Sequence, residues 1–186
     1  MPPAWNPDHT VGDTVELIWS TDTGSWTRLT RPCQGRGTGI TDAAGLVANG
    51  RIYAVWREHT YKDNERPLDV HFCRSDNGGA NWNEPVTVGG LSTMQGSLSL
   101  VLASGPNGRL VIAQDVRDEG GFTGEVQLAI SRDQGQTWPK IVRYSTGSLI
   151  DPAMAFTNDG TLVLAGSARS QDGVRPWVIH SRVAVE

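Results

Sequence analysis

An arginine stands at or near the end of each of three strand-like runs of the sequence, with carboxylates close beside it. The arginines are Arg57, Arg117 and Arg169, and the acidic residues near them are Glu58, Asp118, Glu119 and Asp172. A guanidinium group binds a carboxylate through two parallel hydrogen bonds. This set of residues therefore predicts a binding site for an anionic sugar.

Three more polar residues, Asp42, Ser97 and Asp151, stand where the preceding runs begin and should point toward the same region. Two carboxylates on either side of a glycosidic bond can hydrolyse it. Asp42 or Asp151 set against Glu58 or Asp118 would make such a pair. The competing interpretation is that arginines at the ends of exposed strands are solvated surface residues.

The histidines and cysteines predict neither a metal site nor a cofactor. His59, His71 and His180 lack the spacing of metal ligands. Cys33 and Cys73 are the only cysteines, too few and too far apart for a zinc site or a disulfide framework. We expect both thiols to be unpaired and mostly buried.

The candidate residues lie within a repeat. Three turn-forming segments are related: STDTGSW (20–26), SDNGGANW (75–82) and SRDQGQTW (131–138). Their tryptophans, Trp26, Trp82 and Trp138, are 56 residues apart in both intervals. A fixed period of this size indicates a repeat architecture.

Each repeat predicts four antiparallel strands. The motif serine ends one strand-like run (VELIWS, VHFCRS, VQLAIS), and VIHSRV at 178–183 is a fourth copy without its turn. Upstream, NGRIYAVWRE, NGRLVIAQDVRDE and DGTLVLAGSARS open with Asn-Gly or Asp-Gly, so each should form a hairpin with DAAGLVA, SLSLVLA or DPAMAF. An outer strand such as PVTVGG or KIVRYS completes the unit, and no stretch has helical spacing.

Four-stranded repeats of this kind are propeller blades, so the expected fold is an all-β partial propeller over residues 1–186. Its blade pieces are 10–34, 40–90, 95–146 and 149–186. That makes about three and a third blades, whereas closed propellers have about four to eight. An open array leaves unpaired edges and an apolar flank.

Something is therefore expected to complete the ring. The simplest candidate is a second copy of the chain joined head to tail, giving six blades. In such a ring VELIWS and VIHSRV would compete for one position. The alternatives are a partner chain, a larger assembly, or the remainder of a longer protein.

Composition and charge favour a soluble chain without a nucleic-acid partner. The formal net charge is −4 and the isoelectric point is about 5.5, which argues against binding to nucleic acid or to an anionic membrane surface. The first residues, MPPAWNPDHT, lack a basic segment followed by an apolar run, so we expect no signal peptide. No run approaches the length of a membrane span.

The turn motif resembles the Asp box of the bacterial-neuraminidase repeat (BNR) family, whose pattern is Ser, any, Asp, any, Gly, any, Thr, Trp. The three copies are Ser131, Asp133, Gly135, Thr137 and Trp138, a complete match; Ser75, Asn77, Gly79 and Trp82, with asparagine replacing aspartate; and Ser20, Asp22, Gly24 and Trp26, one residue short. In such a turn Asp or Asn accepts backbone hydrogen bonds, glycine takes a positive φ, and tryptophan covers the gap between sheets. We expect all these residues to be structural.

The resemblance implies a sialidase-like propeller, whose enzymes clamp a substrate carboxylate with three arginines. It also implies a Phe-Arg-Ile-Pro type segment and a tyrosine paired with glutamate, and the sequence offers no match to either: Tyr53, Tyr61 and Tyr144 fall elsewhere. The leading hypothesis is accordingly a non-catalytic module that recognises glycan or protein within an oligomer or larger assembly. The alternatives are a sialidase-like exo-glycosidase acting on an anionic glycan and a structural component of a virion or other assembly.

Overall fold

A computed structural model describes residues 18–19, 27–28, 39–59, 68–91, 99–117, 124–144, 148–170 and 173–181. Within these ranges the chain forms antiparallel β-sheets, and the remaining structure is turns and one three-residue 3-10 turn, η1 (Pro106–Gly108). The all-β prediction is confirmed. No helix in this part of the chain is long and apolar enough to cross a membrane.

The strands fall into three larger sheets and one short pair. The first sheet contains β3 (Gly39–Ala48), β4 (Arg51–His59), β5 (Leu68–Ser75) and β6 (Val86–Thr87); the second contains β7 (Leu100–Ser104), β8 (Leu110–Arg117), β9 (Gly124–Ser131) and β10 (Lys140–Tyr144); the third contains β11 (Ser148–Phe156), β12 (Leu162–Ser170) and β13 (Gly173–Ser181). In each sheet the spatial order follows the chain. The short pair joins β1 (Ile18–Trp19) to β2 (Thr27–Arg28), where a third and an outer strand were expected.

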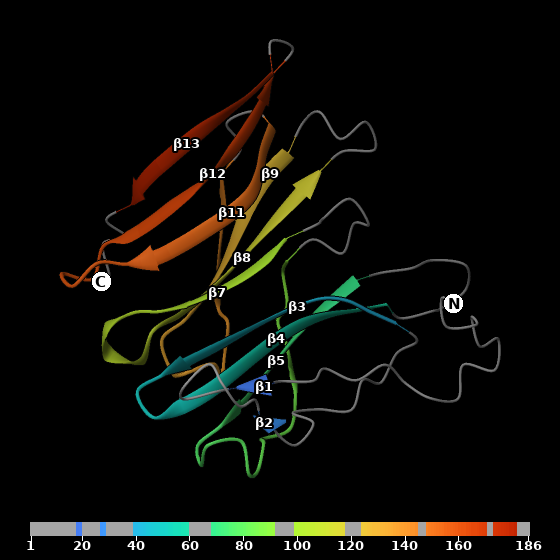
Figure 1. Cartoon of the computed structure of the whole chain (residues 1–186), viewed down its shortest axis with the longest axis vertical. Helices are drawn as coiled ribbons and strands as arrows, with labels where there is room; N and C mark the ends of the chain where they lie inside the picture. The colour runs from blue at the N-terminus through green and yellow to red at the C-terminus, as the bar shows by residue number, and fades with distance from the viewer. Residues whose placement is uncertain are drawn as a thin grey trace.

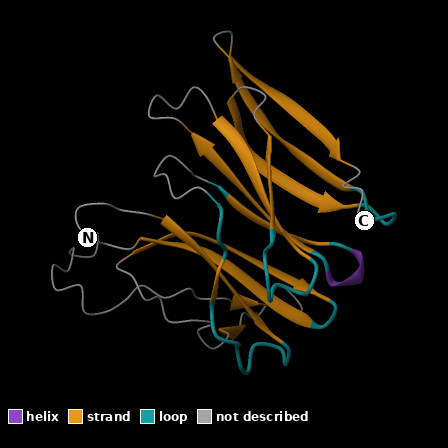
Figure 2. Cartoon of the chain, turned by 180° about the vertical axis from the view of Figure 1, so that it is seen from behind, coloured by secondary structure: helices purple, strands orange, loops and turns teal. Residues whose placement is uncertain are grey.

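The three sheets fan around their inner strands. Strand β7 contacts both β3 and β11, while β6 and β10 lie at the outer edges. Figure 1 shows the sheets following one another along the long axis of the molecule. Figure 2 shows the same fan from behind, with the short helical turn at the hairpin of the second sheet. This arrangement is a partial β-propeller.

The Asn-Gly signals mark the hairpins between inner and second strands. Asn49 and Gly50 both have positive φ angles, 54° and 73°, and join β3 directly to β4. These are the angles that a type I′ hairpin turn requires. Asn107 and Gly108 are also in this region, with φ of 58° and 73°, but they sit in a longer loop that includes η1.

Apolar side chains fill the space between neighbouring sheets. Tyr53, Val55 and Phe72 from the first sheet pack with Leu110 and Ile112 from the second in one buried cluster. Leu128 and Leu162 belong to a second cluster, between the second and third sheets. The alternating strand pattern thus places one apolar face of each sheet against its neighbour.

The two described motif turns have the same hydrogen-bond pattern. In the second sheet the Ser131 hydroxyl accepts from the Gly135 N–H at 2.8 Å, and Asp133 Oδ1 accepts from the Thr137 N–H at 2.9 Å. In the first sheet the same bonds join Ser75 to Gly79 at 2.8 Å and Asn77 to Asn81 at 2.9 Å. Asparagine therefore replaces aspartate without loss of the backbone contact. The first motif copy, residues 20–26, lies outside the described residues.

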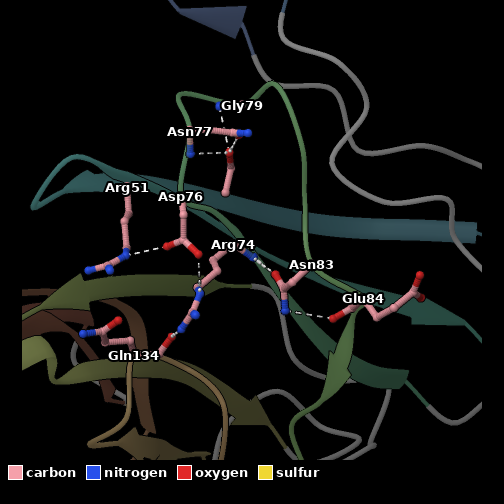
Figure 3. Close-up of polar contacts among 9 residues, drawn as sticks. Arg51, Arg74, Asp76, Asn77, Gly79, Asn83, Glu84 and Gln134 are labelled. Atoms are coloured by element: carbon pink, nitrogen blue, oxygen red, sulfur yellow. Dashed lines mark hydrogen bonds and ion pairs between the residues drawn. The ribbon is translucent and has the colours of Figure 1, made fainter.

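The turn of the second sheet docks onto the first sheet. Trp138 meets the Phe72 ring edge-on, with ring centroids 5.2 Å apart. On the same surface the Arg74 guanidinium donates to the carbonyl of Gln134 at 3.2 Å, and it also pairs with Asp76 (Figure 3). The expectation that a motif tryptophan covers the gap between sheets fits Trp138, which is 8% exposed.

One of the two cysteines belongs to the buried core of the first sheet. Cys73 is fully buried beside Ala54 and Trp56. Cys33 lies outside the described residues.

Candidate functional site

The ends of the three inner strands opposite the motif turns meet around Ser99. The Ser99 carbonyl accepts a hydrogen bond from Arg57 Nη2 at 3.0 Å, and its N–H donates to Asp115 Oδ1 at 2.8 Å. The Ser99 hydroxyl donates to Asp151 Oδ1 at 3.3 Å. Asp42 lies opposite Arg57 in the β3–β4 register. We refer to Asp42, Arg57, Ser99, Asp115 and Asp151 as the Ser99 cluster; it draws on all three sheets.

Irregular backbone positions two of these carboxylates. The β3–β4 register shifts between Ile40 and Asp42, and the β11–β12 register shifts between Ile150 and Ala153, on either side of Asp151. Bulges of this kind re-aim side chains and occur often beside active sites. Asp151 also has φ of +52°, a left-handed conformation that costs energy for a residue other than glycine.

Arg57 is the buried centre of the cluster. It is 1% exposed, so the interpretation of this arginine as a solvated surface residue is wrong. Burial lowers the pKa of Arg57, while the charges of Asp42 and Asp115 raise it. A guanidinium stays protonated in proteins, so Arg57 is a buried cation. Its Nε and Nη1 have no hydrogen-bond partner among the described residues.

Asp42 is held in an environment that disfavours its charge. Burial raises its pKa, and the Asp115 charge adds to that effect. Arg57 and backbone hydrogen bonds from Ala43 and Leu100 act in the opposite direction, but the pKa remains above its usual value. The second carboxylate oxygen, Oδ2, is buried without a hydrogen-bond partner among the described residues.

The three expected arginines are not at one level of the sheets. Ile52, Leu110 and Leu162 lie opposite the equivalent serines of the third strands, Ser75, Ser131 and Ser181. Counting along each second strand from these three residues puts Arg57, Asp115 and Ser167 at the same level. Arg117 and Arg169 lie two residues farther along their strands. The structure describes only the backbone of Arg117 and Arg169. Asp118, Glu119, Asp172 and Ser97 lie outside the described residues.

Glu58 belongs to a different face of the first sheet. Successive residues of a strand point to opposite faces, so Glu58 points away from the side of Arg57. It accepts a hydrogen bond from Trp56 Nε1 at 3.4 Å and lies 3.6 Å from His71 Nε2. His71 stacks on the Trp56 ring. The structure therefore does not place Glu58 so that it could pair with Asp42 or Asp151 across a bound sugar.

The accessible part of the cluster is rich in carboxylates. Asp151 is exposed, and Asp42 and Ser99 are partly buried, whereas Arg57 and Asp115 are enclosed at 1% and 0%. Asp151, and to a smaller extent Asp42 and Ser99, are therefore more accessible to a ligand than the guanidinium of Arg57. No group of three or more His, Cys, Asp or Glu in the described ranges is arranged to hold a metal ion.

The sequence pattern singles out Asp42, Arg57 and Asp151 as candidates, but not Ser99 or Asp115. The available signal for Asp115 was its place in the run VIAQDV, where a charged residue interrupts an otherwise apolar strand. Ser99 had no comparable signal, because its role depends on backbone groups that bond to Arg57 and Asp115.

Solved structures share the fold of this chain. It is similar to the Hadza microbial sialidase Hz136 (16% identity, TM-score 0.61, 79% of this chain and 36% of that one). It is also similar to a Penicillium chrysogenum α-L-arabinanase complexed with arabinobiose (16% identity, TM-score 0.57, 88% of this chain and 51% of that one). A third similar structure is a Bacteroides ovatus protein described as xyloglucan PUL GH43B (12% identity, TM-score 0.55, 90% of this chain and 34% of that one).

The chain spans about a third to a half of the length of these structures. At such low identity the likeness establishes a propeller fold and nothing further. No protein-family model matches the sequence, and no curated protein matches it.

Proposed function

We propose that this chain is a carbohydrate-recognition module of a glycosidase-like propeller, and that the Ser99 cluster is its binding site. The observation that carries the proposal is the convergence of three inner strands on a buried arginine, two of whose donor nitrogens have no partner among the described residues, next to exposed and partly exposed aspartates. Loops and strand ends near the axis of a rigid scaffold are common ligand sites. The similar structures named as a sialidase and as an arabinanase bound to arabinobiose support carbohydrate as the ligand class.

The turns at 75–82 and 131–138 are, on this proposal, Asp boxes of the neuraminidase repeat family. Their paired hydrogen bonds and the complete pattern at Ser131–Trp138 support that assignment. They lie at the opposite end of the blades from the Ser99 cluster. We assign them a structural role, since Asp133 is occupied by bonds from Ser131 and Thr137.

Binding on a glycan array followed by calorimetry tests the recognition site. Asp151→Asn and Ser99→Ala should each weaken binding of a captured glycan about tenfold or more, because each removes or weakens a polar group at the accessible edge. Asparagine also tolerates a positive φ, so Asp151→Asn should fold.

Asp76→Asn is the matched control, since it removes the same charge at the opposite end of the first blade, where Asp76 pairs with Arg51 and Arg74 (Figure 3). Its affinity should equal that of the unaltered chain. Unchanged affinity in Asp151→Asn and Ser99→Ala would contradict the site. Absence of any glycan signal would favour an assembly role instead.

A second candidate function is glycoside hydrolysis at the same place. The observation in its favour is that burial raises the pKa of Asp42, whereas Asp151 is exposed to solvent. Two carboxylates in different environments are what an acid and its partner require. Turnover of fluorogenic glycosides, lost in Asp42→Asn, would replace the non-catalytic proposal, and inactivity toward sialosides and neutral glycosides alike would oppose this second candidate.

We also propose that a second copy completes the ring. Val47 is 69% exposed on β3, on the side away from the second sheet, because Leu46 and Ala48 pack toward that sheet. Val178 is 59% exposed on β13, at the level where Phe72 of the first sheet packs against Trp138. On the outer face of the first sheet Ala54 and Trp56 are already buried, so Val47 marks an exposed patch there. The outer face of the third sheet, with Val174 and Val178 exposed, presents apolar side chains where a neighbouring sheet would pack.

Light scattering should give a molar mass twice the 20.1 kDa of one chain. Val178→Lys should shift the protein toward the monomer, because a charge would have to be buried at the joint. Thr87→Lys is the control, since it adds the same charge on the exposed outer strand β6, away from the proposed joint. A stable monomer at all concentrations would contradict this closure.

A further inference from the structure

We infer that the Ser99 cluster selects neutral sugars and discriminates against sugars that carry a carboxylate. The inference rests on the proposed carbohydrate site and specifies its ligand class. It departs from the expectation, based on the arginine set, that the ligand is an anionic glycan.

The first step is the charge of the cluster. The cluster holds three aspartates and a single described cation: Asp42 and Asp115 act on the charge of Arg57, and Asp151 joins the cluster through the Ser99 hydroxyl. With all four groups ionised, the described side chains of the cluster carry an excess of negative charge. A ligand carboxylate placed among them would face like charges at short range in a partly desolvated site, where such repulsion is strong.

The second step is access. An arginine clamp for an anionic sugar has to present its donors to the ligand. Arg57 is 1% exposed and already donates one hydrogen bond to the Ser99 carbonyl from behind the accessible edge. It acts as a positioning residue, because its charge holds Asp42 and Asp115 together and its hydrogen bond fixes the Ser99 backbone.

The third step is hydrogen-bond complementarity. An ionised carboxylate only accepts hydrogen bonds, and a sugar hydroxyl can donate to it. Asp151, on the inner strand of the third sheet, is exposed and already accepts from the Ser99 hydroxyl. Asp42, on that of the first sheet, is partly buried, and its enclosed Oδ2 lacks a donor among the described residues, which a ligand hydroxyl can supply. A neutral sugar with neighbouring hydroxyls can donate to both carboxylates. A carboxylate on the same sugar can donate to neither.

The backbones of Arg117 and Arg169 stand at a different level of the sheets from the cluster. They lie two residues farther along their strands than Asp115 and Ser167. The test therefore includes Arg117→Ala, which should leave the preference for neutral sugars unchanged.

The experiment compares matched ligands by calorimetry: neutral oligosaccharides, and the same oligosaccharides capped with a uronic or sialic acid. The full chain should bind the neutral member of a pair at least tenfold more tightly. Asp42→Asn and Asp151→Asn should weaken neutral binding and reduce this ratio, because each lowers the negative charge. If Asp42→Asn does not fold, the exposed Asp151→Asn variant carries the test alone.

The outcomes separate the two proposals. Equal or tighter binding of the capped member, weakened by Asp151→Asn, would overturn the neutral preference and leave carbohydrate recognition at the cluster intact. Binding of neither member, or binding insensitive to both aspartate variants, would overturn the site itself. A capped-sugar affinity that depends on Arg117 would also overturn the inference.

Discussion

Replacing Gly135 by alanine is expected to destabilise the folded chain by about 3 kcal/mol or more, combining overpacking with backbone strain. A Cβ at Gly135 would lie 2.1 Å from a carbon of the Phe72 ring, far inside van der Waals contact. The φ angle of +86° adds a conformation that alanine avoids. Phe72 is fully buried between two sheets, so its ring has little room to move aside.

Gly78→Ala is the matched control for this substitution. Gly78 has φ of +69° in the corresponding turn of the first sheet, but a Cβ there would have no heavy atom of a non-adjacent residue within 4 Å. Its cost should be limited to the backbone term, about 1 kcal/mol. Denaturant unfolding of both variants measures the difference. Equal costs would mean that the second turn is not docked on Phe72, and the proposed packing between blades would be wrong.

Replacing Arg57 by methionine should cost about 3 kcal/mol at neutral pH, because two buried or partly buried aspartates lose their cation. Arg57→Met keeps most of the side-chain volume, so the loss reports on charge rather than on a cavity. Arg143→Met is the control: Arg143 pairs with Glu125 at 3.1 Å, but its side chain is 54% exposed. That exposed pair should contribute less than about 1 kcal/mol.

The loss of unfolding free energy in Arg57→Met should depend on pH. Burial already raises the pKa of Asp42 in the folded chain, and Arg57 opposes the rise, so the pKa should climb further in the variant. A carboxyl whose folded pKa exceeds its unfolded value binds protons on folding, so its penalty is largest above the folded pKa and shrinks as pH falls through it. Unfolding free energies of variant and parent should therefore converge from pH 7 toward pH 4. A deficit independent of pH would contradict the electrostatic role of Arg57.

Strand arrangement was predictable because several independent signals agree. The 56-residue period, the Asn-Gly hairpins and the strand-like runs each indicate the same four-stranded unit. The order β3–β4–β5–β6 and its repeat in the second sheet follow that prediction. Asn49 and Gly50 adopt the positive φ angles that the hairpin signal requires.

The site was less predictable, because it depends on register rather than on residue type. Arg57, Arg117 and Arg169 look equivalent when counted from the ends of their runs, but β4 places Arg57 two levels lower than the others. Two bulges, beside Asp42 and around Asp151, then redirect the carboxylates. A pattern of period two carries no information on such shifts, nor on the backbone bonds that bring Ser99 into the cluster.

The most direct test of the account is a crystal structure of the chain bound to the neutral oligosaccharide that it captures most tightly. The account predicts a sugar ring at the ends of β3, β7 and β11, with its hydroxyls within hydrogen-bond distance of Asp42 and Asp151. Arg57 should remain beneath Ser99. A sugar bound instead at the motif turns, on the outer strands, or through a carboxylate on Arg57 would contradict the central claim.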